Sequence, residues 1–250
     1  MKFAMHNYFY DLHIHSCLSP CGDADMTPNN IAGMASLAGL QLLALTDHNT
    51  CGNCAAFFAA CRRYGIVPVP GMELTTAEDI HLVCLFATLE AALAFDAVVK
   101  THLPPMQNRP EIFGNQQICD ENDEIVGEET AFLLGSTDLA LEDAVAMVRA
   151  HGGVCYPAHV DRESNGMIAI LGDIPPEPGF TAVEFHDHEN VAPYTEKYPS
   201  LAPLTVICST DSHYLETIDE AKHAVLLDDE PYSSARVREA LLAWIRGEQT

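Results

Sequence analysis

Asp11-Leu12-His13-Ile14-His15 lies at the end of a short apolar run near the start of this 250-residue chain. Residues two apart on a strand point to the same face of a sheet, so His13 and His15 can aim two imidazole rings at one point. Neutral imidazole is the commonest metal ligand in proteins. Asp11 stands two residues before His13, where its carboxylate can orient that ring. The stretch therefore predicts a metal site at a strand end, provided that other strands deliver further ligands.

The composition is that of one large acidic domain. Hydrophobic residues make up 48% of the chain, which is enough for a sizeable single core. The formal net charge is −24, with 12 Lys and Arg against 36 Asp and Glu. We therefore expect neither duplex nucleic acid nor an anionic membrane as the main partner, because both are bound through basic patches. A small anionic substrate is compatible with this charge, because bound cations reverse the local charge.

The cellular setting is inferred from the N-terminal stretch and the cysteines. Met1–Phe9 lacks the charged-then-apolar pattern of an export signal, and no apolar run approaches the roughly 18 residues of a membrane span. Nine cysteines, an odd number, suit mostly free thiols in a reducing compartment. We expect a cytoplasmic protein, and nothing in the sequence indicates its oligomeric state.

Apolar runs of strand length alternate with segments of helical periodicity. Strands are expected at residues 9–14, 42–45, 66–70, 81–87, 154–158, 182–185, 204–208 and 224–227. Helices are expected at residues 28–38, 55–64, 89–99, 141–150 and 235–245. Thr27-Pro28 suits the start of the first helix, with Thr27 as N-cap, and Gly39 and Gly65 suit the ends of the first two. Such alternation predicts βα units around a parallel sheet, and seven or so units in 250 residues favour a closed barrel in a single domain, residues 1–250.

One segment interrupts the alternation. Between Leu103 and Gly135 the chain is punctuated by prolines, and Asp120-Glu121-Asn122-Asp123 is typical of a turn between two short strands. We interpret residues 103–136 as an insertion that carries a hairpin, and we expect it to cap the active site and to shape substrate selectivity.

Polar residues follow the predicted strands where each one ends. Closure of the sheet would bring them together, because barrel active sites lie at the carboxyl ends of the strands. So many imidazoles and carboxylates exceed the needs of one ion, and a nitrogen and oxygen donor set without thiolate suits Zn, Mn or Fe. Two ions bridged by a carboxylate such as Glu73 could hold the attacking and leaving oxygens of a phosphoryl displacement and turn a bound water into hydroxide. The residues at these ends are His13, His15, His48, Glu73, His159 and Asp211.

Six short motifs in order carry a family resemblance. They are Asp-Leu-His-Ile-His-Ser, Leu-Thr-Asp-His-Asn, Gly-Met-Glu, Ile-His-Leu-Val, Pro-Ala-His and Ser-Thr-Asp-Ser-His, spread over residues 10–214. Together they resemble the PHP (polymerase and histidinol phosphatase) superfamily, and most closely its stand-alone, TrpH-like phosphoesterases, some of which act on nucleoside phosphates. The resemblance implies a distorted, TIM-like (β/α)7 barrel with two or three divalent metal ions.

The resemblance also implies a ligand set. His13, His15, Glu73 and Asp211 would hold one ion, and Glu73, His81 and His159 a second. A third ion would lie between His48, His213 and an acid of the loop that follows His15. Counting back from Thr27-Pro28 places Asp23 at that acid, whereas counting forward from His15 reaches Pro20. The loop is therefore longer than in relatives, and Asp25 is a rival to Asp23.

Other residues have more than one interpretation. Arg162, three residues after His159, is a candidate phosphate clamp, because a guanidinium fork matches phosphate oxygens, or else an outward salt bridge. Asp47 is expected to orient a ligand rather than bind metal. His186 and His188 are expected to contact substrate or solvent. Cys17, Cys21, Cys51 and Cys54 lie in two neighbouring loops, where four thiolates could hold zinc or an iron–sulfur cluster.

The sequence thus predicts a metal-dependent phosphoric monoester hydrolase. Its substrate would be a small phosphomonoester, a nucleotide or similar, attacked by metal-bound hydroxide at a di- or trinuclear centre. Glu73, Asp211 and His213 would serve catalysis through the metals, and Arg162 would assist. The alternatives are a metal-dependent amidohydrolase, or a non-hydrolytic, redox-linked module built on the four cysteines.

Overall fold

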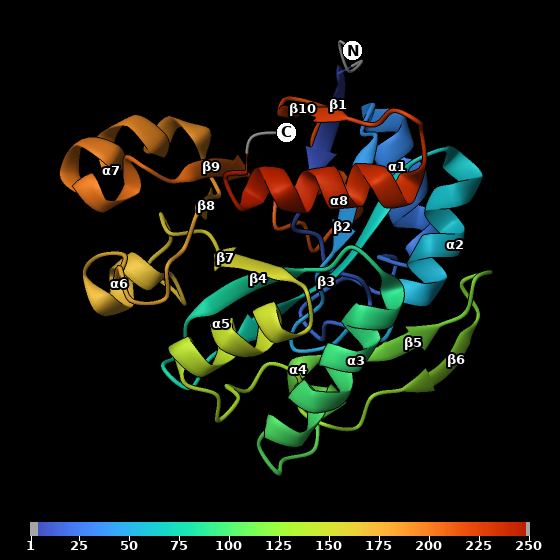
Figure 1. Cartoon of the computed structure of the whole chain (residues 1–250). Coiled ribbons are helices and arrows are strands. Elements are labelled where there is room, and N and C mark those ends of the chain that lie inside the picture. The colour runs from blue at the N-terminus through green and yellow to red at the C-terminus, as the bar shows by residue number, and fades with distance from the viewer. Residues whose placement is uncertain (1–4, 249–250) are drawn as a thin grey trace.

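The computed structural model describes residues 5–248, so the first four residues of the Met1–Phe9 stretch lie outside it. Its centre is a curled six-stranded sheet (Figure 1). In spatial order the strands are β10 (Ala224–Asp228), β1 (Met5–Asp11), β2 (Leu42–Leu45), β3 (Val67–Thr75), β4 (His81–Leu85) and β7 (Val154–Pro157). β1, β2 and β3 run parallel, whereas β10 is antiparallel to β1, and β4 is antiparallel to β3 and β7.

The predicted barrel is confirmed only as a curled sheet of mixed α/β type. β8 (Ala182–Phe185) and β9 (Thr205–Cys208) pair in parallel as a separate sheet, so hydrogen-bonded strands do not close a ring within residues 5–248. Loop contacts bridge the two openings: Val160 N donates to Glu184 O at 2.9 Å, and His15 N donates to Ser212 O at 3.0 Å. β4 reverses direction because only residues 76–80 join it to β3, too few for the crossover that a parallel strand needs.

Five longer helices cover the sheet. They are α1 (Pro28–Ala38), α2 (Cys54–Tyr64), α3 (Leu89–Val99), α5 (Leu141–Ala150) and α8 (Ser234–Ile245), and α8 crosses the sheet in Figure 1. Gly39 and Gly65 end α1 and α2 with φ of 83° and 70°, as predicted. The hydroxyl of Thr27 makes no cap bond and instead donates to Asp123 Oδ2 at 2.6 Å. Among residues 5–248, no helix combines the length and apolar character that crossing a bilayer requires.

The shorter helical segments lie in the loops between these elements. They are α4 (Pro110–Phe113), α6 (Met167–Leu171) and α7 (Val191–Lys197), with 3-10 turns at Lys100–His102, His188–Asn190, Pro199–Leu201 and Leu215–Thr217.

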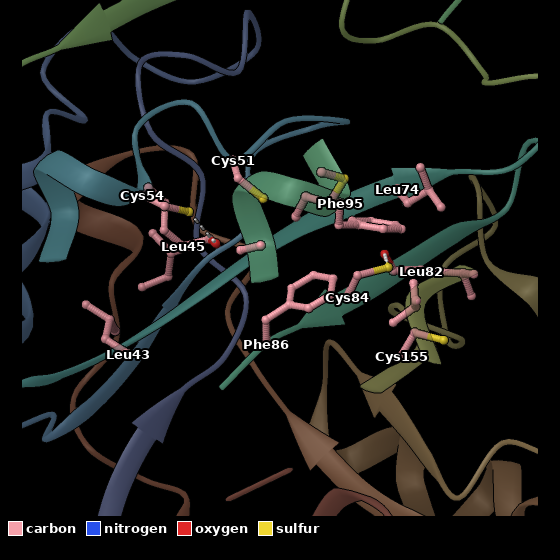
Figure 2. Close-up of a cluster of buried hydrophobic side chains, with 14 of the residues drawn as sticks. Leu43, Leu45, Cys51, Cys54, Leu74, Leu82, Cys84, Phe86, Phe95 and Cys155 are labelled. Atoms are coloured by element: carbon pink, nitrogen blue, oxygen red, sulfur yellow. Dashed lines mark hydrogen bonds between the residues drawn. The ribbon is translucent and has the colours of Figure 1, made fainter. Parts of the chain in front are cut away.

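Apolar side chains fill both faces of the sheet. Along β2, Leu43 and Leu45 point into the cluster shared with α1, α2, α3 and α5, whereas Leu42 and Ala44 join the cluster shared with α8. This alternation is that of a strand buried on both sides. Figure 2 shows the first cluster, in which Cys84 lies between Phe86 and Leu82. The cysteines expected in the core (Cys61, Cys84, Cys155 and Cys208) are all buried.

The insertion forms the hairpin β5 (Gln117–Cys119) and β6 (Ile125–Glu128), which lies beside α2 (Figure 1). It packs on the loop from residue 16 to residue 27, hereafter the first loop: Gln117 N donates to Cys17 O at 3.0 Å. Cys119 N donates to Asn53 Oδ1 at 2.9 Å, just before α2. The insertion therefore supports the first loop from outside.

Candidate metal centre

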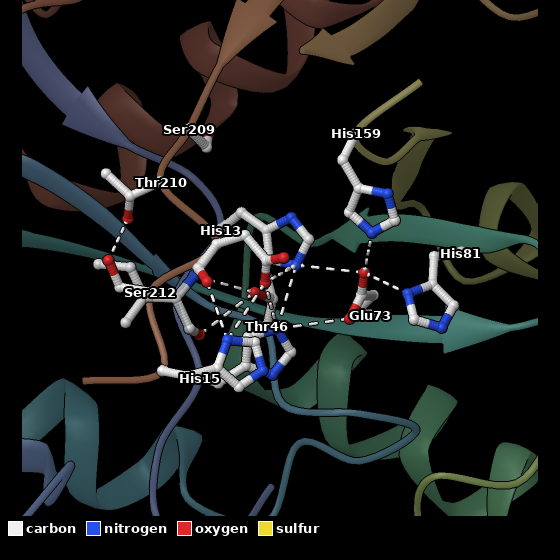
Figure 3. Close-up of polar contacts among 12 residues, drawn as sticks. His13, His15, Thr46, Glu73, His81, His159, Ser209, Thr210 and Ser212 are labelled. Carbon is white, nitrogen blue, oxygen red and sulfur yellow. Dashed lines mark hydrogen bonds and ion pairs between the residues drawn. The ribbon is translucent and has the colours of Figure 1, made fainter. Parts of the chain in front are cut away.

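Strand ends and loops at one end of the sheet bring most of the predicted ligands together, and Figure 3 shows His13, His15, His81 and His159 around Glu73. Glu73 is buried in β3, with Oε1 2.7 Å from His81 Nδ1 and 3.0 Å from His159 Nε2, and Oε2 2.9 Å from His48 Nδ1. His81 reaches this end because β4 is antiparallel, so that its first residue lies beside the last residue of β3. One carboxylate thus faces imidazoles from three separate segments of the chain.

The rings of His13 and His15 converge on one point. His13 Nδ1 lies 2.8 Å from Glu184 Oε1, and the carboxylate there can only accept, so Nδ1 carries a proton. His15 Nδ1 lies 2.9 Å from Ser19 Oγ, whose own proton goes to Asp47 Oδ1 at 2.8 Å. Both rings therefore direct Nε2 to the same point, with the two nitrogens only 3.1 Å apart. Once both nitrogens have released their protons, a metal ion between them could accept both lone pairs.

Asp211 completes this group. Its Oδ1 lies 3.3 Å from His13 Nε2 and 3.0 Å from His15 Nε2, and it is buried without a well-aligned hydrogen-bond donor. Asp211 and His159 have positive φ, 52° and 29°, a backbone conformation that residues other than glycine rarely adopt. Strain of this kind is found where a side chain must be held in a fixed direction.

The two central carboxylates stay ionised. Burial alone would raise the pKa of Glu73, but the surrounding imidazoles, led by His81 and His13, hold it well below its ordinary value. Burial likewise opposes ionisation of Asp211, and His13 and His15 again outweigh it and lower its pKa. Two ionised carboxylates buried next to each other attract cations.

The imidazoles divide into two classes. Burial disfavours the charged form of His15 and His48, but nearby carboxylates, led by Asp211 for His15 and Glu73 for His48, raise both pKa values to about 9. Burial lowers the pKa of His81, and burial with the charge of His15 lowers that of His213 to about 3. The protons on His15 and His48 compete with any metal ion for the same ring nitrogens.

Donor atoms gather in three overlapping groups, each within 4.8 Å. His13, His15, Glu73 and Asp211 form the first, which is the set that the resemblance implies. His48, Glu73 and His81 form the second, with His159 also against Glu73, and His15, His48 and His213 form the third. The residues present therefore fit more than one divalent ion.

Asp23 and Asp25, the acids expected at the third ion, belong to none of these groups within the described chain. Both are exposed. Asp23 Oδ1 accepts from Asp25 N at 2.8 Å, which turns its carboxylate toward its own loop. Only the backbone of Asp23 reaches the centre, where its N–H donates to His213 O at 2.9 Å.

Asp47 supports the ligands from behind, the role expected for it. Its Oδ1 accepts from Ser16 N at 2.7 Å and from Ser19 Oγ, and its Oδ2 accepts from Ser16 Oγ at 2.7 Å. Ser19 in turn contacts the ring of His15 and accepts from His48 N at 3.1 Å. Asp47 thus fixes the first loop beneath two ligands without facing the cluster.

Arg162 lies at the mouth of the centre. One guanidinium nitrogen pairs with Asp211 Oδ2, and the other lies 3.1 Å from His186 Nδ1. Arg162 lines a cleft of about 200 Å³ with the ligands and with Ser164 and Asn165. His186 thus contacts the candidate clamp, whereas the ring of His188 stacks on that of His223, with 5.6 Å between centroids, outside the lining of the cleft.

Glu184 is a functional candidate that the sequence interpretation missed. It is buried in β8, where Oε1 accepts from His13 Nδ1 and, at 3.2 Å, from His159 N. The signal was present, because a charged residue inside the apolar run Ala182–Phe185 needs a partner. Glu184 orients one ligand ring and positions the backbone of another.

Replacing Glu184 with glutamine is expected to weaken metal binding by about 10-fold to 100-fold, the range for contacts that orient a ligand. Chelator competition measures this. Activity should return when the metal is raised to saturation, because every ligand remains. An affinity equal to that of the unchanged protein would remove Glu184 from the centre.

The four cysteines of the redox alternative do not meet. None of the potential metal groups found among residues 5–248 contains a cysteine. Cys51 Sγ lies 3.2 Å and Cys54 Sγ 3.6 Å from Gly71 O, in the core, whereas Cys17 Sγ lies 3.5 Å from the sulfur of Cys119, a residue the sequence interpretation did not consider. A cluster of the four thiolates therefore has no geometric support.

Two curated relatives share parts of the sequence. An error-prone DNA polymerase of Symbiobacterium thermophilum is 39% identical over 77 residues, 31% of this chain and 7% of the polymerase. A 3',5'-nucleoside bisphosphate phosphatase of Chromobacterium violaceum is 38% identical over 73 residues, 29% of this chain and 25% of the phosphatase. The chain thus spans a quarter or less of the length of these relatives.

Solved structures share the fold. The lesion-specific endonuclease Q of Pyrococcus furiosus superposes with a TM-score of 0.62 at 16% identity, over 97% of this chain and 56% of the endonuclease. A provisionally named metal-dependent phosphoesterase of Bifidobacterium adolescentis gives 0.53 at 18% identity, over 93% and 95% of the two chains.

One expectation based on charge is overturned by these comparisons. Endonuclease Q has been solved in complex with a 27-mer duplex, with a TM-score of 0.59 at 16% identity, over 94% of this chain and 56% of that one. Since that protein and the polymerase relative act on nucleic acid, the exclusion of duplex nucleic acid as a partner was wrong. Net charge describes the whole surface, whereas a bound strand meets only the part around the site.

Family membership follows from the extent of the match. Six short motifs predict the PHP superfamily over residues 10–214, and the histidines of these motifs meet Glu73 and Asp211 in one cluster. The PHP domain profile matches residues 11–240. That match covers the motifs, extends beyond their C-terminal end and takes in most of the chain. The chain therefore belongs to the PHP domain family.

Proposed function

We propose that this chain hydrolyses phosphomonoesters of small molecules such as nucleotides, with two or three divalent ions of Mn, Fe or Zn at the cluster around Glu73. The observation that carries the proposal is the cleft in which Arg162 stands beside the ligands. No other arginine and no lysine lines this cleft within the described residues. A single guanidinium next to a cation-attracting cluster is suited to a phosphate group.

The chain's own residues have distinct roles in this proposal. Ions held at the cluster would neutralise phosphate charge and lower the pKa of a water. His13, His15, His48, His81, His159, His213, Glu73 and Asp211 would hold them. Arg162 would exchange its pairing with Asp211 for the phosphate oxygens, and Ser164 and Asn165 would border the substrate. The two sequence relatives are a DNA polymerase and a bisphosphate phosphatase, which supports phosphoester chemistry over amide hydrolysis.

Phosphate release from a substrate panel tests the proposal. The panel holds nucleoside monophosphates, 3',5'-bisphosphates, short single and duplex oligonucleotides, and amides, each assayed with Mn, Fe or Zn added. We expect free phosphate from the monoesters. Shortened oligonucleotides without such release would favour the second candidate, phosphodiester cleavage in nucleic acid, which the duplex-bound endonuclease supports. Amide hydrolysis alone would favour an amidohydrolase.

Exchanging Arg162 for lysine is expected to lower kcat/KM by about 10-fold to 100-fold. A charge-assisted hydrogen bond contributes about 1.5–3 kcal/mol, and lysine keeps the charge but loses the planar fork. Steady-state kinetics measure this with metal content checked in parallel, because Arg162 also pairs with Asp211. Unchanged kinetics at equal metal content would contradict the role of Arg162.

The insertion of residues 103–136 is proposed to influence selectivity through the first loop, where Gln117 N donates to Cys17 O, and through Asn49, which follows His48. Asn49 Nδ2 donates to Leu133 O at 2.8 Å and to Gly135 O at 3.0 Å, so the segment touches residues next to His48. Its residues do not line the cleft itself. Shortening the β5–β6 turn and ranking the panel again tests this proposal, and an unchanged ranking would contradict it.

A further inference from the structure

Two cysteines from distant parts of the chain meet beside the first loop. Cys17 of that loop and Cys119 of β5 are 102 residues apart in sequence, and their sulfurs lie 3.5 Å apart. Both side chains are buried, and both thiols are free. A disulfide bond holds two sulfurs about 2.05 Å apart, so a bond here requires the sulfurs to approach by only about 1.5 Å. Rotation of the two side chains is enough for a movement of this size.

The backbone holds the two cysteines in this position. Gln117 N donates to Cys17 O at 3.0 Å, and Cys119 N donates to Asn53 Oδ1 at 2.9 Å. Asn53 Nδ2 in turn donates to Gln117 O at 3.1 Å and to Ser16 Oγ at 3.0 Å. Asn53 is fully buried, so a single amide ties the residue before Cys17 to the strand that carries Cys119. The contact between the sulfurs therefore follows from how the backbone is held.

The insertion and the first loop also fit closely a few residues away. A Cβ at Gly114 would lie 2.0 Å from Pro20 O, so the backbone of the insertion lies against the first loop at a place where only glycine fits. A covalent bond between the two segments would thus fix a contact that already exists.

A hollow of about 330 Å³ borders the pair. Cys17 lines it together with Gly114 and Gln117 of the insertion. A water molecule takes up about 30 Å³ in the liquid, so a peroxide with its two oxygen atoms fits easily into the hollow. A small oxidant can therefore reach two thiols that are otherwise covered.

We propose that Cys17 and Cys119 are a redox-active dithiol, which hydrogen peroxide and other small hydroperoxides oxidise to a disulfide that joins the insertion to the first loop. The bond forms irrespective of the reaction that the metal centre performs.

The oxidation needs a hydroperoxide and no other reactant. Contact with the Cys17 thiol lowers the pKa of Cys119, which makes Cys119 the source of the attacking thiolate. Its sulfur bonds to one oxygen of hydrogen peroxide as the O–O bond breaks, which leaves a sulfenic acid and one water. The sulfur of Cys17 then displaces the sulfenic oxygen, which leaves as a second water. The two thiols lose two electrons and two protons in all, and the peroxide gains them.

The disulfide would restrain the loop that supports two ligands. Ser19 of the first loop contacts the ring of His15 and accepts from His48 N. A bond at Cys17 limits the loop movements through which these rings separate from an ion. We therefore expect the oxidised protein to release metal severalfold more slowly than the reduced one, a consequence that alone rests on the proposed metal centre.

Mass spectrometry after peroxide treatment locates the bond. The reduced full chain, freed of metal with a chelator, is treated with hydrogen peroxide, alkylated, and digested after Asp and Glu without reductant. This digestion places Cys17 in residues 12–23 and Cys119 in residues 112–120. In the Cys21→Ser variant each of these peptides contains one cysteine, so a linked pair identifies the bond. We expect the linked pair in this variant, and its loss after dithiothreitol.

Thermal unfolding gives a second readout. A disulfide that closes a long segment of a domain of this size is expected to raise Tm by about 4–16 °C. The Cys21→Ser variant, whose serine borders the same hollow, should show this rise on oxidation, and Cys119→Ser should show none. Each variant is compared with its own reduced form, so a lower starting stability of Cys119→Ser does not affect the result.

Several outcomes would overturn the dithiol. They are alkylation of both Cys17 and Cys119 after peroxide treatment, a bond from Cys17 to Cys21 in their place in the unchanged protein, and an unchanged Tm. Zinc release to a chelator, compared between the oxidised and reduced forms of the zinc-loaded protein, tests the effect on the metal centre, and equal rates would overturn that effect. A chain that forms the bond but binds no zinc would confirm the dithiol and contradict the proposed function.

Discussion

Replacing Glu73 with glutamine is expected to abolish binding of the two ions that share it and to lower phosphate release by more than about 100-fold, beyond the loss of a supporting contact. Glutamine has the shape of glutamate but no charge, and its NH2 group would face imidazole nitrogens that now contact Glu73 within 3.4 Å. Elemental analysis and a phosphate assay on the same preparation measure the two effects.

Glu78→Gln is the matched control for this experiment. Glu78 is exposed in the turn after β3, where its carboxylate accepts from Leu141 N at 3.0 Å. The Glu78→Gln variant is expected to keep full metal content and activity. Circular dichroism should confirm that both variants fold. A Glu73→Gln protein that retains all its ions would show that the carboxylate of Glu73 is not a metal ligand.

Metal affinity is expected to rise steeply with pH between about 6 and 9. His15 and His48 have pKa values raised to about 9, so both carry protons at neutral pH and must release them before their nitrogens can bind an ion. Each released proton contributes about a factor of ten per pH unit, so these two give up to about 100-fold per unit. His13 adds a further proton, because Glu184 and Asp211 outweigh burial and hold its pKa well above the ordinary value. Above pH 9 the rings of His15 and His48 are neutral and their contribution should level off.

Chelator competition at several pH values, with proton release recorded in weak buffer, measures this dependence. His81 and His213 add nothing to it above pH 7, because their pKa values are lowered. His48→Gln removes one of the two protons and should reduce the slope by about one. An affinity that does not change with pH would show that both rings are already neutral in the metal-free protein.

The sequence predicts most of the elements but not how all of them pair. The apolar runs and the glycines after α1 and α2 are local signals, and the strands and helices they indicate are present. The direction of β4 is a tertiary outcome of a short connection. Whether β8 joins β7 depends on pairing between distant segments, which periodicity does not encode.

The cluster itself could be predicted because its ligands stand in short motifs at strand ends. His81 stands at the start of its strand, and the antiparallel β4 explains how it still reaches the others. The acid of the first loop could not be assigned, because two ways of counting disagree wherever a loop differs in length. Glu184 and Cys119 were missed because each acquires meaning only through a partner far away in sequence.

The pairing of β1 with β10 determines when the metal centre can form during folding. Met5 lies opposite Asp228, and His15 N is bonded to Ser212 O, so the earliest ligands of the chain are fixed by some of its latest residues. Contacts this distant close only after the residues up to Asp228 have left the ribosome, which makes folding slow. Until then the His13–His15 pair has no Asp211 beside it. Loading with metal is thus a late step in the biogenesis of this protein, and the nascent chain emerges without a formed centre that a wrong ion could occupy.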